Sequence, residues 1–188
     1  MSTGHTLIHG PTTAGRLDRV LNDPRVQRAL ARPWRLDLQH DLPYLGGYSM
    51  DGHTIYIDRH LPASILVSDR LTHIRAPIIT HERTEKALMD ALGWGYPEAH
   101  EFATANEHFR VRTAGVSQAA YESALAEYVK AAAHERITLP PVDLDLAPYM
   151  QEHDYRLLQH LKEAISSQRV RQPSTSPPTP QAAIQEYA

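Results

Sequence analysis

The segment from Ile78 to Val111 constrains the fold of this chain most strongly, because it predicts two helices joined by a tight turn. Apolar residues recur every three or four positions from Ile78 to Leu92 and again from Pro97 to Val111, which is the spacing of amphipathic helices. Residues 93–96 read Gly-Trp-Gly-Tyr, and glycine adopts the backbone angles that tight turns require. We therefore expect a helical hairpin with one buried face on each helix.

The buried faces of these two predicted helices carry ionisable side chains. The inward positions include His81 and Glu85 on the first helix, and His100 and Glu107 on the second. A buried charge without a partner is costly, so these groups need protons, one another or a metal ion. If the chain turns at residues 94–95, His81 lies level with residue 108 and Glu85 with residue 104. Glu107 and His100 then come within reach of the first helix.

A β-hairpin is expected before the helical hairpin. The pair Asp51-Gly52 separates two segments rich in aromatic and β-branched residues, 44–50 and 53–58, which is a strong hairpin signal. Asp58, at the end of the second segment, either caps a turn or points into a site. The apolar residues of 65–67 and 71–74 fit a third short strand or a helical turn equally well.

Helical spacing recurs in three other parts of the chain. The expected helices are two short ones within Arg16–Ala31, one from Gln118 to Glu135, and one from Gln151 to Ile165. Between the last two, prolines in Leu139–Tyr149 exclude a regular helix, so this segment should be extended. These elements predict an α+β fold that is mainly helical, with a helical hairpin core and a small β-hairpin or short sheet packed beside it.

We expect one globular domain from residue 16 to residue 166. Residues 1–15 are polar and turn-rich, which predicts a flexible N-terminus. Residues 167–188 are rich in Ser, Gln and Pro, with too little apolar surface to offset the entropy of ordering. That segment should form a disordered or peripheral tail.

Composition excludes several classes of function. The chain has no cysteine, so disulfides and thiolate metal sites are ruled out. A net charge of -3 and a pI near 6.4 argue against a nucleic-acid partner. No apolar run of about 18 residues predicts a membrane span, and the start of the chain does not resemble a secretion signal. These features predict a soluble, cytoplasmic protein without a membrane partner, whose oligomeric state stays open.

The segment His81–Glu85 reads His-Glu-x-x-Glu, one residue different from the His-Glu-x-x-His motif of zinc enzymes. In that motif two ligands one helical turn apart hold zinc, and the glutamate between them is the general base. Here Glu85 stands at the second ligand position, and a carboxylate oxygen also binds zinc. By this pattern Glu82 is the candidate general base.

The second helix extends the likeness. The segment from Ala105 to Glu107 resembles the Asn-Glu segment of gluzincin metallopeptidases, in which the glutamate is the third zinc ligand. The chain also resembles a group of phage and bacterial proteins with a His-Glu-x-x-Glu helix, on the matches Ile57–Arg59, His81–Glu85, Tyr96–Glu107 and Pro141–Asp145. The first resemblance implies a peptide or protein substrate. The second implies no particular activity.

Two hypotheses of different classes follow. In the first, the chain is a zinc-dependent hydrolase resembling metallopeptidases, in which His81, Glu85 and either His100 or Glu107 hold Zn²⁺. Whichever of His100 and Glu107 does not bind the metal would orient one of the ligands through a hydrogen bond. In the second, the chain is a non-enzymatic, phage-related accessory or interaction protein, and the same side chains form a metal-free buried network.

Overall fold

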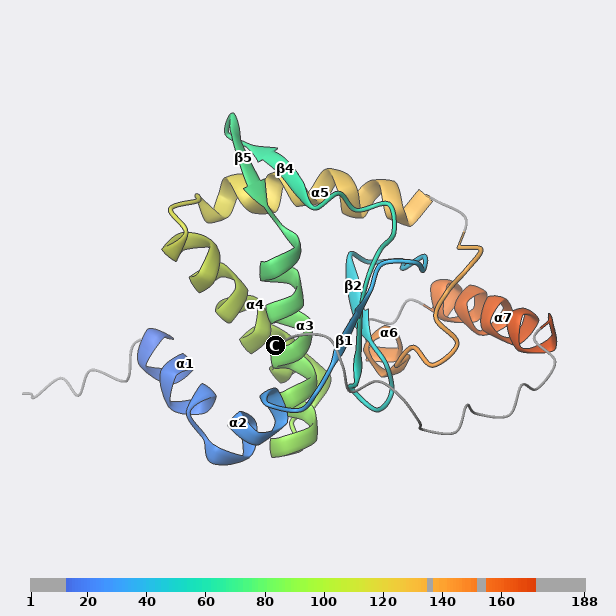
Figure 1. Cartoon of the computed structure of the whole chain (residues 1–188), viewed down its shortest axis with the longest axis horizontal. Helices are drawn as coiled ribbons and strands as arrows, with labels where there is room; N and C mark the ends of the chain where they lie inside the picture. The colour runs from blue at the N-terminus through green and yellow to red at the C-terminus, as the bar shows by residue number, and fades with distance from the viewer. Residues whose placement is uncertain (1–12, 135–136, 152–154, 172–188) are drawn as a thin grey trace, which may run out of the picture.

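The helical hairpin predicted from residues 78–111 forms the centre of the structure (Figure 1). A computed structural model describes residues 13–134, 137–151 and 155–171. Helix α3 (Arg75–Leu92) and helix α4 (Tyr96–Thr113) pack along one another. Gly93 ends α3 with φ 67°, a left-handed conformation that glycine adopts without strain. Pro97 lies in the first turn of α4, where its missing N–H leaves no hydrogen bond unmade.

A three-stranded sheet packs beside α3. It contains β1 (Arg35–Asp37), β2 (Gly46–Tyr48) and β3 (Thr54–Ile57), in the order β1-β3-β2. β2 and β3 are antiparallel, so the hairpin predicted around Asp51-Gly52 is confirmed. β1 runs parallel to β3. β1 was not predicted, because three residues that stay largely exposed give no alternating pattern.

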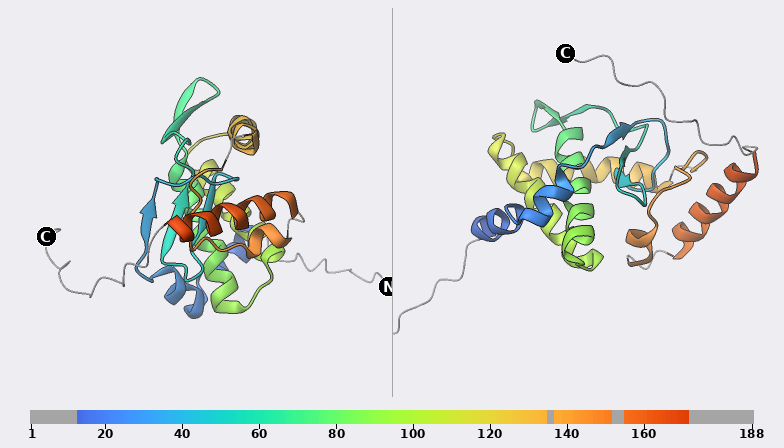
Figure 2. Two further views of the ribbon diagram at one scale, coloured as in Figure 1. Left: turned by 90° about the vertical axis from the view of Figure 1, so that its right-hand side faces the viewer. Right: turned by 60° about the horizontal axis from the view of Figure 1, so that its bottom comes forward.

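Residues 65–74 were predicted to form either a short strand or a helical turn, and they form strands of a second sheet. β4 (Ser64–Val67) and β5 (Arg70–His73) form an antiparallel pair through a turn at Ser68 and Asp69, both with positive φ. This pair projects from the molecule beside α5 (Gln118–His134), as Figures 1 and 2 show. α5 matches its prediction over the described residues.

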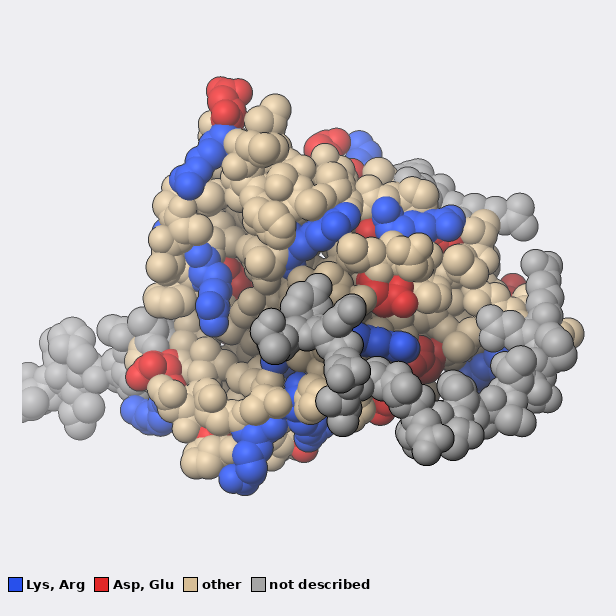
Figure 3. Space-filling view, viewed as in Figure 1, with Lys and Arg blue, Asp and Glu red and all other residues tan. Residues whose placement is uncertain are grey.

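The remaining helices lie on two sides of the helical hairpin formed by α3 and α4. α1 (Thr13–Leu21) and α2 (Pro24–Leu30) confirm the two short helices expected within Arg16–Ala31. They pack against α3 and α4, whereas α6 (Ala147–Gln151) and α7 (Tyr155–Arg171) lie beyond the sheet (Figure 1). Among the described residues, no helix is long and apolar enough to cross a bilayer. On the face in Figure 3, basic and acidic side chains are interspersed.

The last part of the chain differs from its prediction in two ways. A short helix, α6, begins within the segment expected to be extended, because Pro148 occupies its first turn, where proline is tolerated. The described part of the final helix starts at Tyr155, because residues 152–154 lie outside the described residues. It continues to Arg171, beyond the predicted domain boundary at residue 166. The rest of the expected tail, residues 172–188, and most of the expected flexible N-terminus lie outside the described residues.

Asp58 caps a turn, one of its two predicted roles. Its side chain is buried and accepts hydrogen bonds from the backbone N–H groups of Leu42 at 2.7 Å and His60 at 2.8 Å. Both carboxylate oxygens are therefore occupied by the backbone of the sheet's loops.

Asp41 joins two distant parts of the chain. Its Oδ2 accepts hydrogen bonds from the backbone N–H groups of Thr138 at 2.7 Å and Leu139 at 2.8 Å. Its Oδ1 lies 2.5 Å from Arg59 Nε. Burial alone would raise the pKa of Asp41, but these hydrogen bonds and the Arg59 charge hold that pKa below its ordinary value.

We predict that Asp41→Asn lowers the free energy of unfolding at pH 7 by about 1–3 kcal/mol, because an amide cannot accept all these bonds. Since the folded state lowers the pKa of Asp41, its contribution is complete above the unfolded carboxyl pKa of about 3.9. That contribution is lost as the pH falls further through the lower pKa of the folded state. Urea unfolding of wild type and variant from pH 7 to acid pH measures both effects.

The matched control is Asp69→Asn in the β4–β5 turn. Asp69 is exposed and has φ 64°, an angle that asparagine also adopts. This substitution should leave the free energy of unfolding nearly unchanged. Equal effects of the two substitutions would contradict the assignment of Asp41 as a joint between the two segments.

Candidate metal centre

Three of the predicted ligands meet between α3 and α4. His100 Nδ1 lies 2.8 Å from Glu85 Oε2 and 3.2 Å from His81 Nε2. His81 Nε2 lies 3.4 Å from Glu85 Oε2. His81 and Glu85 are one helical turn apart on α3, and His100 faces them from the first turns of α4. One donor atom from each side chain therefore points to a common centre.

The separations of these three atoms fit a small cation. Zinc bonds of about 2.0–2.2 Å at tetrahedral angles hold ligand atoms about 3.3–3.6 Å apart. The separation of 3.4 Å lies in that range and 3.2 Å just below it, whereas the 2.8 Å between His100 and Glu85 is a hydrogen-bond length that would widen by about half an ångström around a metal. Two imidazole nitrogens and a carboxylate oxygen are also a donor set that zinc accepts. The group can hold a metal ion with little rearrangement.

Glu107 lies on the opposite side of the His81 ring from this group. Its Oε2 is 3.0 Å from His81 Nδ1, and its Oε1 accepts a hydrogen bond from the Tyr121 hydroxyl at 2.7 Å. A carboxylate can only accept, so His81 Nδ1 carries a proton, and a metal that bound at Nε2 would displace the second proton of the ring. Of the two residues left open by the sequence, the geometry therefore favours His100 as the third ligand, with Glu107 orienting His81.

Two tyrosines contact the other ligands, Tyr48 at the outer oxygen of Glu85 and Tyr96 at the metal-facing nitrogen of His100. Tyr48 comes from β2, and its hydroxyl donates to Glu85 Oε1 at 2.7 Å, which leaves Oε2 facing the two histidines. The hydroxyl of Tyr96, at the start of α4, lies 3.3 Å from His100 Nδ1. Both tyrosines are largely buried. Strand β2 thus contributes to the orientation of a ligand on α3.

The electrostatics of the group follow from burial and mutual contact. Burial alone would raise the pKa of Glu85, but hydrogen bonds from His100 and His81 lower it to about 2. Burial likewise opposes the charged form of His81, yet its contacts with Glu107 and Glu85 raise its pKa to about 10. Contact with His81 keeps the pKa of Glu107 below its ordinary value despite burial. Both carboxylates are therefore ionised near neutral pH.

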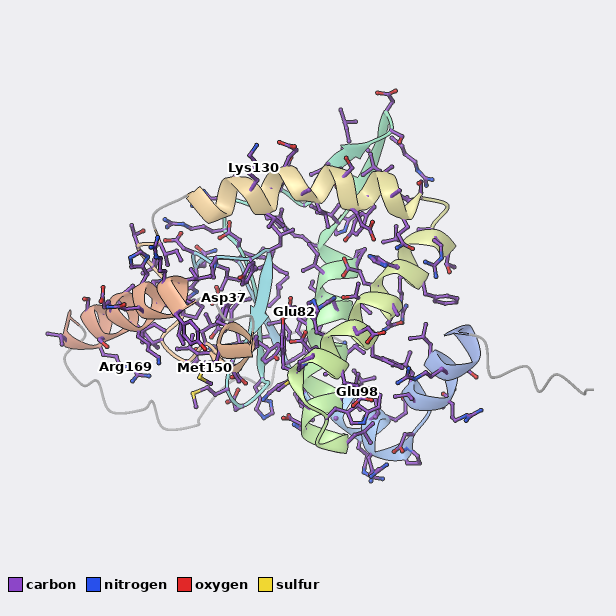
Figure 4. All side chains as sticks on the ribbon, turned by 180° about the vertical axis from the view of Figure 1, so that it is seen from behind. Asp37, Glu82, Glu98, Lys130, Met150 and Arg169 are labelled. Atoms are coloured by element: carbon purple, nitrogen blue, oxygen red, sulfur yellow. The ribbon has the colours of Figure 1, made fainter. Side chains whose placement is uncertain are left out.

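Glu82 lies beside the group, on the side of α3 that faces the sheet, and Figure 4 shows it between the helices and the strands. Burial raises the pKa of its carboxyl to about 8, the His81 charge opposes this shift, and the negative charges of Glu85 and Glu107 add to it. Gly46 on β2 makes room for this side chain, because an added Cβ would lie 2.5 Å from Glu82 Oε1.

A cavity of about 300 Å³ opens onto the group. His81, Glu82, Glu85 and His100 form part of its lining. The remaining walls come from β2 and its flanking loop, from the start of α4, and from the segment that leads into α6. Their residues are Tyr44, Gly46, Gly47, Tyr48, Tyr96, Asp145, Pro148 and Tyr149. The three candidate ligands and Glu82 are thus open to a molecule bound in one cavity.

The tyrosines around the site were not predicted from the sequence. Tyr121 lies on the helix predicted from Gln118 to Glu135, and its ring packs in the core while its hydroxyl donates to Glu107. Tyr48 was placed in the predicted β-hairpin without a contact to the helices. No local pattern marks either residue as a partner of a carboxylate far away in the sequence, so spacing alone could not find them.

Comparisons of this chain with models of known protein families, with curated proteins and with solved structures found no match. The resemblances of the two helices to gluzincin metallopeptidases and to the phage and bacterial group therefore stay predictions.

We predict that zinc raises the melting temperature of the wild-type chain and that a chelator reverses the shift. A ligand that binds only the folded state stabilises it by about 2.7 kcal/mol at 100 times its Kd. His100→Ala removes one of the three ligands and should lose most of this gain. His73→Ala, which removes an exposed histidine on β5, should retain it. Thermal melts that do not change with zinc or chelator would count against the metal centre.

We further predict that Glu107→Gln weakens zinc binding by about 10–100-fold, because an amide orients the His81 ring less well than a carboxylate does. Competition with a chromogenic chelator measures the affinity. Glu101→Gln, an exposed position on the same helix, is the control and should bind zinc as the wild type does. Complete loss of binding with Glu107→Gln would instead make Glu107 a direct ligand.

Proposed function

We propose that this protein is a zinc-dependent hydrolase that cleaves a peptide or amide bond. His81, Glu85 and His100 would hold the metal, and Glu82 would act as general base. The observation that carries the proposal is the spacing of the three donor atoms, 2.8, 3.2 and 3.4 Å, at the wall of a cavity that Glu82 also lines. Three protein ligands with an open fourth position are typical of catalytic zinc sites.

Each protein group has a definite part in the proposed reaction. Bound zinc would lower the pKa of a coordinated water towards about 7 and polarise the substrate carbonyl. Glu82 would accept a proton from the attacking water and return it to the departing amine. Burial raises the pKa of Glu82 in the absence of metal, and the positive charge of a bound zinc ion would lower it and so favour the carboxylate form that a general base requires.

The substrate class rests on the resemblance of the helix pair to metallopeptidases and on the shape of the cavity. A volume of about 300 Å³ accommodates a small group beside the bond to be cleaved. The cavity walls contain four tyrosines and a proline next to the carboxylates. This mixture suits a peptide segment, which has both apolar side chains and amide groups.

A second candidate function has one observation in its favour. His81, His100, Glu85 and Glu107 also satisfy one another in direct contacts of 2.8–3.4 Å, so they form a complete polar network without a metal. Such a network would specify how α3 and α4 pack in a non-enzymatic accessory or interaction protein. The melts with zinc and chelator separate the two candidates, because only a metal-linked fold shifts.

We predict that Glu82→Gln keeps zinc but loses hydrolysis by about 10²–10⁴-fold, because an amide cannot take a proton from water. Elemental analysis of tag-free protein gives the zinc content, and cleavage of a library of quenched fluorescent peptides gives the activity. Glu98→Gln, an exposed position in the first turn of α4, is the control. Full activity of Glu82→Gln would refute its assignment as general base, and loss of zinc would make it a ligand.

A further inference from the structure

One side chain on the cavity wall takes no part in the metal centre described above. Tyr149, on α6, is 3% exposed, and its hydroxyl forms no hydrogen bond with any described residue. An added Cβ on Gly47 would lie 3.6 Å from this hydroxyl oxygen, and Gly47 lines the same cavity. The hydroxyl oxygen is reachable from the cavity rather than sealed within the protein, so a molecule bound there can accept its hydrogen bond.

The position of this hydroxyl is fixed from several directions. The Tyr149 ring stacks on Tyr44 with centroids 5.5 Å apart and an angle of 10° between the planes. Its other side belongs to the apolar cluster that includes Leu158 and Leu161 of α7. A donor held in this way needs no reorganisation when it meets a developing charge, which is the condition for strong stabilisation.

The backbone that leads to Tyr149 is attached to the edge of the sheet. Asp145 N–H donates to Tyr48 O at 2.9 Å, and Met50 N–H donates to Asp143 O at 2.9 Å. α6 also contacts α4, the helix that carries His100. The segment therefore holds the Tyr149 hydroxyl beside β2 and near the start of α4, at the wall of the same cavity as the metal ligands.

The charge around Tyr149 keeps its hydroxyl a donor. Burial raises the pKa of Tyr149 well above its ordinary value, and the negative charges of Glu82 and Glu85 raise it further. The hydroxyl thus retains its proton at any pH at which the protein would work. Among the tyrosines of the cavity, Tyr48 already donates to Glu85, whereas Tyr149 has its donor available for the bound molecule.

We propose that the Tyr149 hydroxyl donates a hydrogen bond to the substrate carbonyl oxygen during hydrolysis, an inference that rests on the proposed function. Glu82 takes a proton from water as the water oxygen bonds to the carbonyl carbon. The π electron pair of the carbonyl moves to its oxygen, where Tyr149 stabilises the negative charge. When that pair returns, the C–N bond breaks and the amine leaves with the proton from Glu82. Tyr149 itself neither gains nor loses a proton.

The test is Tyr149→Phe in the full chain loaded with zinc, with Tyr128→Phe on α5, remote from the cavity, as control. The substrate is the quenched fluorescent peptide that the wild type cleaves fastest. We expect kcat to fall by about 10²-fold, as for the loss of one oxyanion donor, while KM and zinc content stay unchanged. The melting temperature should also stay unchanged, because the hydroxyl has no partner among the described residues.

Three results would overturn this inference. Wild-type kcat in Tyr149→Phe would show that the hydroxyl does not contact the reacting oxygen. A rise in KM at constant kcat would show that it binds substrate and transition state equally. A lower melting temperature or a loss of zinc would show a structural role instead.

A second measurement separates failure of this inference from failure of the proposed function. If the wild type binds zinc but cleaves no peptide, the hydrolase proposal fails. Acetohydroxamate, whose carbonyl oxygen would occupy the same position on the metal, then serves as the probe. Its affinity, measured by calorimetry, should be about 10-fold weaker for Tyr149→Phe than for the wild type. Equal affinities would overturn the assignment of Tyr149.

Discussion

The hydrogen bond between His81 and Glu107 is the contact on which the centre of this protein depends. It lies between α3 and α4 at 3.0 Å and joins the two helices where both side chains are largely buried. Buried charges without partners would oppose packing of the hairpin, so the helices can come together only if these groups meet. The rest of the site follows, because fixing Nδ1 of His81 directs Nε2 towards Glu85 and His100.

The sheet and α5 supply tyrosines that hold the carboxylates of the two helices. Tyr48 from β2 and Tyr121 from α5 each donate to a carboxylate of the hairpin at 2.7 Å. Each of these carboxylates therefore has a histidine on one oxygen and a tyrosine on the other. Gly46 allows β2 to pass close to Glu82, and both residues line the cavity. The cavity is thus a product of four separate parts of the chain, the β-hairpin, α3, α4 and the segment through α6.

Local pattern was sufficient for much of this structure. The helical hairpin, the two short N-terminal helices, the β-hairpin at Asp51-Gly52 and α5 were predicted with boundaries within a few residues of those observed. The sequence also predicted that Glu107 stands across from His81 and that His100 comes within reach of the first helix, because the rise per residue of two antiparallel helices fixes which residues are level. β1 and α6 were missed, since elements of three and five residues are too short for either period to repeat.

The sequence by itself determined that imidazole and carboxylate groups face each other across a helical hairpin, because helix periodicity and the position of the turn depend only on neighbouring residues. The tertiary structure alone decided that His100 rather than Glu107 completes the group of three, since which side of the His81 ring each residue occupies depends on helix rotation. It also decided that Tyr48, Tyr121 and Tyr149 surround the site. These residues reach it from other elements, and contacts between distant segments arise from packing of the whole chain rather than from any local spacing.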